Sequence, residues 1–247
     1  MFSIFRKKAH TEFPVKEVLA VFESDWHCHL LPGIDDGAPD ETETLAMLEA
    51  YVALGIKKIV ATPHIHGDYY RNTSASILQA LNIAQRLVEK HHLPLVLEAA
   101  AEYYADEHFL RLIEKDDLLL IDNQYLLFEL PMQQPSLLGL KWAEKIQQKG
   151  YTPLLAHPER YRYWHNRPQQ WQSWKNAGVC FQLNLLSLTG YYGKAEKRAA
   201  EQLLDADCID AIGTDAHRHG HLQKLNELTH NPSFNALQNV PLLNRLG

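Results

Sequence analysis

Short apolar segments rich in strand-forming residues alternate along the chain with longer segments whose apolar residues recur every three or four positions. The first pattern is typical of buried β-strands and the second of amphipathic helices. Strands are expected near residues 21–27, 58–62, 94–99, 125–130, 152–156, 179–184 and 209–213. Because helical segments separate them, the pattern predicts βα units and a largely parallel sheet, and these seven strands are enough to close a β/α barrel.

The helix over residues 40–54 has the clearest boundaries. Asp40 and Glu43 form a capping-box pattern at its start, and Gly55 follows its end. The same period of apolar residues predicts further helices over residues 74–91, 136–149, 168–177 and 194–204. Each predicted helix ends close to the next predicted strand, as expected for a repeated βα unit.

The composition is that of an ordinary globular protein. The chain has 247 residues, of which 46% are hydrophobic and 22% are charged. We expect an N-terminal extension, residues 1–20, followed by one α/β domain over residues 21–247. The formal net charge of -6 gives no general attraction for nucleic acid or anionic lipid. No partner of either kind is therefore expected, and the oligomeric state is not predicted.

The use of cysteine indicates a reducing compartment. Cys28, Cys180 and Cys208 are scattered and form no CxxC pair, which argues against a disulfide framework and a thiolate zinc site. The basic N-terminus is not followed by an apolar run of signal-peptide length, and no later segment reaches membrane-spanning length. We therefore expect a cytoplasmic protein without direct membrane insertion.

Potential metal ligands follow nearly every predicted strand. The chain has 14 histidines, many of them in short clusters. The candidates at or just beyond strand ends are His27, His29, His64, Glu102, Glu129, His157, Asp215 and His217. Because the carboxyl ends of barrel strands converge on one face, residues distant in sequence are expected to meet in one pocket there.

The first cluster combines two imidazoles with two carboxylates. His27 and His29 are two residues apart, so on extended backbone both point to the same side and can bind one cation, although such a pair alone is also compatible with a structural role. The loop L-P-G-I-D-D-G at residues 31–37 then brings in Asp35 and Asp36. Asp36 is favoured as a ligand, whereas shaping the turn is an equal alternative for Asp35.

The next candidates lie beside apolar strands. Pro63 breaks a β-branched strand so that His64 can turn into the pocket, whereas His66 is equally well interpreted as a hydrogen-bonded wall residue. Glu102 and Glu129 adjoin apolar segments, where an unpaired carboxylate is costly, so a cation or a salt bridge has to compensate them. The surplus of acids over bases favours a metal, and a carboxylate can bridge two ions.

The last candidates add a phosphate-binding group. His157 lies in A-H-P-E-R, three residues before Arg160, whose planar guanidinium suits bidentate recognition of phosphate. Asp215 and His217 repeat the two-residue spacing in G-T-D-A-H. Oxygen and nitrogen ligands without thiolate suit zinc, manganese, iron or magnesium. Two or three such ions can generate hydroxide and clamp phosphoryl oxygens, so hydrolysis of a phosphate ester is the expected reaction.

Two other phosphate chemistries are excluded. Phosphatases with a cysteine nucleophile need an arginine six positions after the cysteine, but the three cysteines are followed at that spacing by Ile34, Leu186 and Thr214. Neither a G-x-x-x-x-G-K-[ST] loop nor a Gly-rich dinucleotide signature occurs.

Taken together, these motifs resemble the polymerase-and-histidinol-phosphatase (PHP) superfamily, and within it the bacterial protein-tyrosine phosphatases of capsule and exopolysaccharide synthesis. The strings that carry the resemblance are D-x-H-x-H at 25–29, L-P-G-I-D-D-G at 31–37, A-T-P-H at 61–64, A-E-Y-Y at 101–104, A-H-P-E-R at 156–160 and G-T-D-A-H at 213–217. They occur in order over about residues 22–220. The resemblance implies a distorted seven-stranded β/α barrel with two to three divalent ions, manganese first and iron, zinc or magnesium as alternatives.

The resemblance also implies a role for each residue. One metal would be held by His27, His29, Glu102 and Asp215; a second by Glu102, Glu129 and His157; and a third by Asp36, His64 and His217. Arg160 would contact the substrate phosphate, with Arg218 as a second, weaker hypothesis. The expected partner is a phosphotyrosine-bearing tyrosine kinase that governs polysaccharide export. His66 and Asp68 are the candidates nearest in sequence for the acid that protonates the leaving group.

These observations predict a metal-dependent protein-tyrosine phosphatase that attacks phosphorus with a metal-bridging hydroxide and forms no covalent phosphoenzyme. A small-metabolite phosphatase, such as one acting on histidinol phosphate, is the alternative within the same class. A metal-stabilised binding module without catalysis is the alternative from another class.

Overall fold

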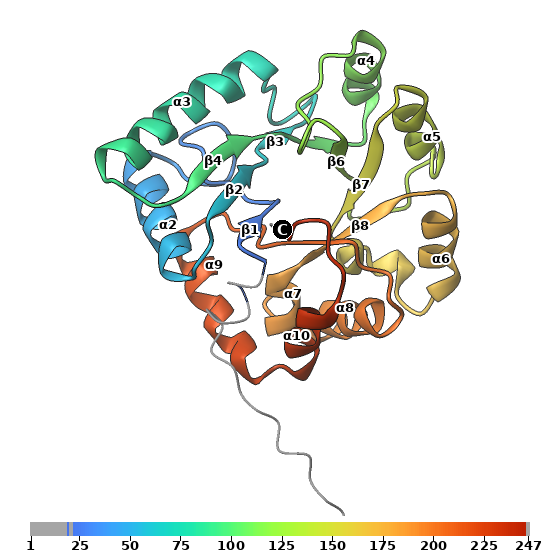
Figure 1. Ribbon diagram of the computed structural model, residues 1–247. Helices are drawn as coiled ribbons and strands as arrows, with labels where there is room; N and C mark the ends of the chain where they lie inside the picture. Colours follow the sequence, from blue (N-terminus) through green and yellow to red (C-terminus); the bar gives the residue numbers. More distant parts are fainter. Residues whose placement is uncertain (1–18, 20–21, 246–247) are drawn as a thin grey trace, which may run out of the picture.

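The computed structural model describes residue 19 and residues 22–245 (Figure 1). The predicted N-terminal extension lies outside these residues apart from Leu19. Helices surround an inner group of strands, and segments from both halves of the chain meet around the centre of the molecule (Figure 1). No helix in the described part is long and apolar enough to span a membrane.

The described strands form two sheets in which every pairing between named strands is parallel. The three-stranded sheet has the order β1 (Ser24–Asp25), β2 (Lys58–Ala61) and β4 (Val96–Ala99). The six-stranded, curled sheet has the order β3 (His64–Ile65), β5 (Glu102–Tyr104), β6 (Tyr125–Glu129), β7 (Thr152–Ala156), β8 (Cys180–Asn184) and β9 (Ala211–Gly213). The α/β class with a parallel sheet is thereby confirmed.

The described part has nine strands where seven were predicted, because β3 and β5 were not expected as separate strands. Pro63, between β2 and β3, lacks the N–H that would continue the hydrogen-bond ladder from the β2–β4 pair into the β3–β5 pair. Across this interruption Ala100 N donates to Ala61 O at 2.9 Å, and Glu102 N donates to Pro63 O at 3.1 Å. The chain therefore continues in the same direction after the break, but in a second sheet.

The segments that follow the first and last strands also lie side by side. Cys28 and Ala216 form an isolated parallel bridge, and His29 N donates to Ala216 O at 2.9 Å. Asp215 N likewise donates to His27 O at 2.7 Å. These bonds bring the two predicted histidine-containing motifs at opposite ends of the chain into direct contact.

Five of the observed helices correspond to predicted ones: α2 (Glu41–Ala53), α3 (Ser74–Lys90), α5 (Lys141–Gln148), α6 (Pro168–Asn176) and α8 (Lys194–Asp205). Helix α5 begins later than predicted; Ser136 Oγ accepts from Leu138 N in the turn before it and from the Trp142 side chain of the helix. The prediction missed α4 (Glu107–Lys115), α7 (Leu185–Thr189), α9 (His219–Lys224) and α10 (Pro232–Ala236). Short 3-10 turns lie at η1 (Pro158–Arg160), η2 (Arg162–Trp164), η3 (Leu225–His230) and η4 (Leu237–Asn239).

The predicted capping box at the start of α2 is only half formed. The Asp40 side chain accepts from Thr42 N and Glu43 N, as predicted. The Glu43 carboxylate, however, accepts from His219 N at 2.6 Å instead of returning to the backbone of Asp40. Glu43 therefore ties the start of α9 to α2, and the reciprocal half of the predicted box is wrong.

The inner face of the sheets changes from apolar to polar along the strands. A small apolar cluster contains no helix residue, so it lies on the strand face away from the helices; it consists of Trp26, Val60, Ala100, Ile121, Leu127, Leu154, Ala156 and Ala211. Because side chains two residues apart share a face, Glu129 follows Leu127 on this inner face. Gln182 and Asn184 follow Cys180 on it in the same way. Buried polar groups thus gather at the carboxyl ends of the strands.

Candidate metal centre

All nine predicted ligands belong to groups whose nitrogen and oxygen atoms lie within 4.8 Å of one another. The four groups are His29/Asp36/His64/His217, His27/His29/Glu102, His27/His157/Asp215 and His64/Glu102/Glu129. Because several side chains belong to two groups, the groups form one continuous cluster. The side chains expected at distant strand ends therefore lie together in one cluster, and metal binding by them stays a prediction.

At the centre of the cluster, the Nε2 atoms of His27 and His29 lie close to each other and to one carboxylate oxygen each of Glu102 and Asp215. His27 Nε2 lies 3.3 Å from His29 Nε2 and 3.3 Å from Glu102 Oε2. Asp215 Oδ1 lies 3.5 Å from the first of these nitrogens and 3.3 Å from the second. Four ligands at about 2.1 Å from a tetrahedral zinc-like ion are about 3.4 Å apart. The separations from the two histidine nitrogens to Glu102 and to Asp215 are close to this value, so a cation beside His27 and His29 could reach either carboxylate.

The tautomers of the two histidines support the same conclusion. His27 Nδ1 lies 2.7 Å from Gln182 Oε1, and His29 Nδ1 lies 2.8 Å from Asp35 Oδ2. Both oxygens are acceptors, so each Nδ1 carries the proton and each Nε2 directs a lone pair toward the other ligand atoms. Glu102 Oε2 is buried and has no hydrogen-bond partner. Lone pairs gathered without a donor are unfavourable, and a cation removes that cost.

The pKa values of the buried groups are shifted because several carboxylates lie close together in the cluster. Burial and the neighbouring Glu102 raise the pKa of Glu129 well above its ordinary value. Burial also works to raise the pKa of Glu102, but His27 and His64 outweigh it and lower that pKa well below the usual range. Burial by itself lowers the pKa of His27, but the nearby carboxylates of Glu102 and Asp215 outweigh burial, so the pKa of His27 is raised. Without a cation, protons therefore have to balance the charges of this cluster.

Glu102 has the position of a bridging ligand. Its Oε2 atom faces His27 and His29, whereas its Oε1 atom lies 3.0 Å from His157 Nε2. The same His157 nitrogen lies 3.8 Å from Glu129 Oε2. Glu102 thus contributes one oxygen to the central group and the other to the pair His157 and Glu129.

The remaining predicted ligands lie toward the outside of the cluster. Asp36 Oδ1 is 3.5 Å from His64 Nε2 and 3.5 Å from His217 Nε2. The other nitrogen of His64, Nδ1, lies 3.1 Å from Glu102 Oε2. The rings of His29 and His217 are stacked with centroids 4.0 Å apart. This outer group is therefore continuous with the central one.

Two of the predicted ligands occupy left-handed backbone conformations that are unfavourable for residues with a Cβ. His157 directly follows β7 with φ 36°, and Asp215 follows β9 with φ 49°. Such a conformation costs about 1 kcal/mol or more outside glycine. Both residues nevertheless direct their side chains into the cluster, and strain retained at such positions is typical of functional sites.

Sequence reasoning left open one important positioning residue and missed another. Asp35, for which a turn role was the alternative, accepts from His29 Nδ1, from Gly37 N at 2.9 Å and from His64 N at 3.1 Å. Burial opposes its ionisation, but His29 and His64 lower the pKa of Asp35 to about 2. Gln182 was not predicted at all, although a fully buried glutamine on the apolar strand β8 is the signal that identifies it.

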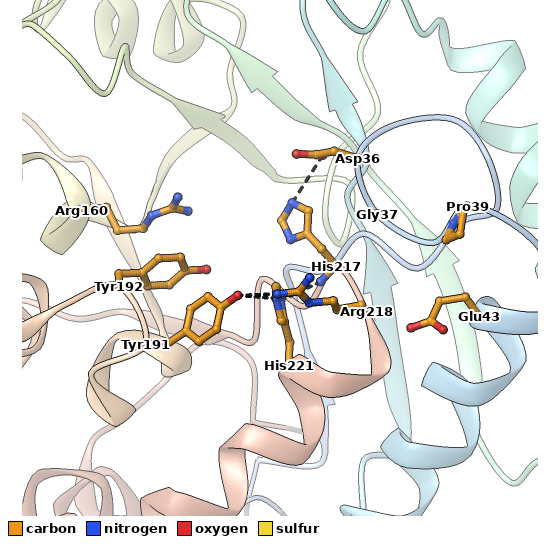
Figure 2. Close-up of a pocket in the computed structure, with 10 residues that line it drawn as sticks. All are labelled: Asp36, Gly37, Pro39, Glu43, Arg160, Tyr191, Tyr192, His217, Arg218 and His221. Carbon is orange, nitrogen blue, oxygen red and sulfur yellow. Dashed lines mark hydrogen bonds and ion pairs between the residues drawn. The ribbon is translucent and has the colours of Figure 1, made fainter.

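A cavity of about 580 Å³ opens beside the outer ligands (Figure 2). Asp36 and His217 line one side of it, and Arg160, Arg218 and Tyr192 line the rest together with Tyr191, His221, Glu43, Pro39 and Gly37. The guanidinium of Arg160 donates to Asp215 Oδ2 at 2.8 Å and lies 4.3 Å from the Tyr192 ring centroid. Two arginines beside a metal-ligand cluster suit an anionic ligand.

His66 and Asp68 do not line this cavity. The His66 ring is stacked on Tyr104 with centroids 4.0 Å apart, and its Nδ1 accepts from Asp68 N at 3.0 Å. His66 therefore has the contacts of the hydrogen-bonded wall residue that was its alternative interpretation.

Comparison with known proteins identifies the family. The family model described as "Capsular polysaccharide synthesis, CpsB/CapC" matches residues 23–228. The chain belongs to this CpsB/CapC family. The resemblance predicted from the sequence motifs is thereby confirmed.

Relatives of this CpsB/CapC protein are named as phosphatases. It is 34% identical over 194 residues to tyrosine-protein phosphatase YwqE of Bacillus subtilis, covering 78% of this chain and 76% of YwqE. It is 27% identical over 203 residues to tyrosine-protein phosphatase CpsB of Streptococcus pneumoniae, covering 78% of this chain and 82% of that CpsB. A solved structure from work on YwqE and CpsB, described as "unique metal-dependent tyrosine phosphatases", matches with a TM-score of 0.76 and 29% identity over 90% of this chain and 95% of that one.

Proposed function

We propose that this CpsB/CapC protein is a metal-dependent protein-tyrosine phosphatase of capsule or exopolysaccharide synthesis. The observation that carries the proposal is that the Nε2 atoms of His27 and His29 each lie 3.3–3.5 Å from Glu102 Oε2 and from Asp215 Oδ1, while the buried Glu102 Oε2 has no hydrogen-bond partner. The adjoining cavity with Arg160 and Arg218 suits a phosphate ester. The names of the relatives, tyrosine-protein phosphatases, supply the substrate class.

The residues fit a cluster of two to three divalent ions, with manganese first and iron, zinc or magnesium as alternatives. As the resemblance implies, His27, His29, Glu102 and Asp215 would hold one ion, Glu102, Glu129 and His157 a second, and Asp36, His64 and His217 a third; the members of each set lie within 3.8 Å of another member. Bound divalent ions supply an activated water and neutralise the charge of phosphoryl oxygens. The absence of a suitably placed cysteine and arginine pair supports direct hydrolysis without a covalent phosphoenzyme.

Arg160 orients the phosphate in this proposal. Asp215 and the Tyr192 ring fix its guanidinium between the metal ligands and the cavity. A fixed, planar fork contacts two phosphoryl oxygens at little entropic cost. Arg218 is the second contact, because it lines the opposite wall and its guanidinium is held by Tyr191.

The same proposal extends to the architecture and the partner. Counted as one strand each, β2 with β3 and β4 with β5 leave seven strands, and the Cys28–Ala216 bridge would close them into a distorted barrel of PHP type. The partner is a phosphotyrosine-bearing tyrosine kinase in the cytoplasm. The scattered cysteines support a reducing compartment, and the capsule-synthesis family supports a kinase of that process.

The direct test is hydrolysis of a phosphotyrosine peptide by metal-stripped protein titrated with manganese, beside a His157→Ala variant. We expect activity to return with the metal and to be lost in the variant, because His157 lies 3.0 Å from the bridging Glu102. Histidinol phosphate is the comparison substrate. A strong preference for it, or inactivity with every divalent metal, would overturn the proposal.

A further inference from the structure

Two adjacent tyrosines line the cavity, and their hydroxyl groups have different partners. Tyr191 and Tyr192 follow α7 directly after Gly190, whose φ of 82° ends that helix. Their rings are perpendicular, with centroids 5.0 Å apart. Figure 2 shows both hydroxyl groups directed toward the middle of the pocket from the same wall. The hydrogen bonds that each hydroxyl makes within the protein determine whether its proton remains available to a ligand.

The Tyr192 hydroxyl is fully engaged by the protein. It accepts from Asn184 Nδ2 at 3.2 Å and donates to Asp215 Oδ2 at 3.3 Å. Its proton is therefore committed to a predicted metal ligand, and it supports the position of that carboxylate.

The Tyr191 hydroxyl, in contrast, accepts two hydrogen bonds. Arg218 donates to it through NH2 at 2.8 Å, and a guanidinium can only donate. His221 Nε2 lies 3.0 Å from the same oxygen. His221 Nδ1 accepts from His217 N at 3.2 Å, so the ring proton is on Nε2 and this nitrogen donates to Tyr191. Both lone pairs of the phenol oxygen are thus occupied.

The proton of the Tyr191 hydroxyl has no acceptor among the described residues. Among the described residues its oxygen makes no hydrogen bonds other than those to Arg218 and His221. The side chain is 39% exposed and lines the cavity. A hydroxyl that accepts from a cation is also a stronger donor, because hydrogen bonds in a chain polarise one another. The free proton is consequently available to an anion in the cavity.

We propose that Tyr191 is a phosphate-binding residue: its hydroxyl, held in place by Arg218 and His221, donates a hydrogen bond to a phosphoryl oxygen of the substrate. This inference rests on the proposed function, which supplies the phosphate ester. In this proposal Arg218 has two roles: its guanidinium lines the cavity, and it orients and polarises the Tyr191 hydroxyl. It gives His221 the role of a positioning residue that contacts no substrate.

The competing interpretation is that Tyr191 only fastens α9 to the end of α7. Removing the hydroxyl would then lower thermal stability and leave phosphate affinity unchanged. A phosphate donor gives the opposite pattern, with weaker phosphate binding at unchanged metal content. These two patterns can be measured separately.

The experiment compares Tyr191→Phe with the parent full-length protein, both loaded with manganese. Binding of inorganic phosphate is measured by calorimetry, and metal content and melting temperature are measured in parallel. Because a hydrogen bond to a charged group is lost, we expect phosphate to bind roughly tenfold or more weakly. We expect kcat/KM for a phosphotyrosine peptide to fall at least as much. Tyr151→Phe is the matched control, since that hydroxyl donates to Asp116 at 3.0 Å on the surface.

Parent-like phosphate affinity in a folded, metal-loaded Tyr191→Phe protein would overturn the inference. If that variant does not fold, Tyr191→Gln and Tyr191→Met make the same comparison, because only the glutamine can donate; equal affinities would then count against the inference. A parent protein that binds phosphate but hydrolyses no phosphotyrosine would instead contradict the proposed function, and the phosphate titration would still decide the role of Tyr191.

Discussion

Asp35 Oδ2 lies 2.8 Å from His29 Nδ1, whereas Glu102 and Asp215, two other predicted ligands, lie near His29 Nε2 on the other side of the ring. This contact fixes the tautomer in which His29 Nε2 is free to bind a cation. The same carboxylate accepts from the backbone of Gly37 and His64, so it also holds the loop at residues 31–37 against the strand β3. Asp35 thus positions His29 and His64, two of the predicted metal ligands.

The first prediction follows from this contact. Asp35→Ala should weaken manganese binding by about 10- to 100-fold, because residues that orient a ligating histidine typically have effects of that size. Manganese titration of the metal-stripped protein measures it. Asp40→Ala is the control from the same segment: it removes the N-cap of α2 and should lower stability by about 1 kcal/mol while leaving metal affinity unchanged. Equal metal affinities for the two variants would contradict the assignment.

The second prediction concerns Arg160. Arg160→Lys keeps the charge but removes the planar fork, so we expect kcat/KM for a phosphotyrosine peptide to fall roughly 10- to 100-fold. Arg162→Lys is the control, because Arg162 is exposed and pairs with Glu196. Steady-state kinetics of both variants at equal metal content decides the point. An active Arg160→Lys enzyme with unchanged kcat/KM would rule out bidentate phosphate recognition by this residue.

The third prediction concerns stability and pH. Burial raises the pKa of Glu159 to about 7, even though its carboxylate accepts from Ser187 Oγ and Asn184 N. Because the folded protein holds this proton more tightly than the unfolded chain, its contribution to stability is present below about pH 4.5 and is lost as the pH rises through about 7.

Glu159→Gln should therefore remove part of the decline in melting temperature between pH 5 and pH 8, a range set by that pKa of about 7. Thermal melts of metal-loaded protein across this range measure the effect. Glu107→Gln, which changes an exposed carboxylate beside Arg111, should leave the decline as it is. A parent-like pH profile for Glu159→Gln would show that this buried carboxyl does not titrate in the folded protein.

The fourth prediction concerns metal removal. The buried carboxylates and imidazoles of the cluster repel one another or require protons when no cation is present. A chelator should therefore lower the melting temperature, and added manganese should restore it in a concentration-dependent way. Calorimetric melts at several metal concentrations test this. A melting temperature that does not respond to metal would contradict the proposed coupling of metal binding to folding.

Sequence patterns singled out the side chains that gather in the cluster because their positions depend on local geometry. His27 and His29 face one way owing to their spacing on extended backbone, and strand ends can be recognised from the change of apolar to polar residues. The contacts that complete the site depend on the tertiary fold. Gln182 meets His27 across 155 residues, and Glu43 meets His219 across 176 residues. No local pattern encodes such partners.

The same distinction explains the errors in the predicted elements. The break between β2 and β3 lies opposite the break between β4 and β5, so both depend on how these strands pair. In the sequence, only the first break is marked, by Pro63. Helices α7 and α10 have five residues each, too few to show a helical period. The hydrogen bonds that leave the Tyr191 proton free join segments that are 27 and 30 residues away from it.

The central claim is that a divalent cation lies between His27, His29, Glu102 and Asp215. Crystals grown with manganese and measured at the manganese absorption edge test it most directly. The account predicts an anomalous peak within about 2.0–2.3 Å of His27 Nε2, His29 Nε2, Glu102 Oε2 and Asp215 Oδ1. Active protein whose crystals show no peak at that position would contradict it.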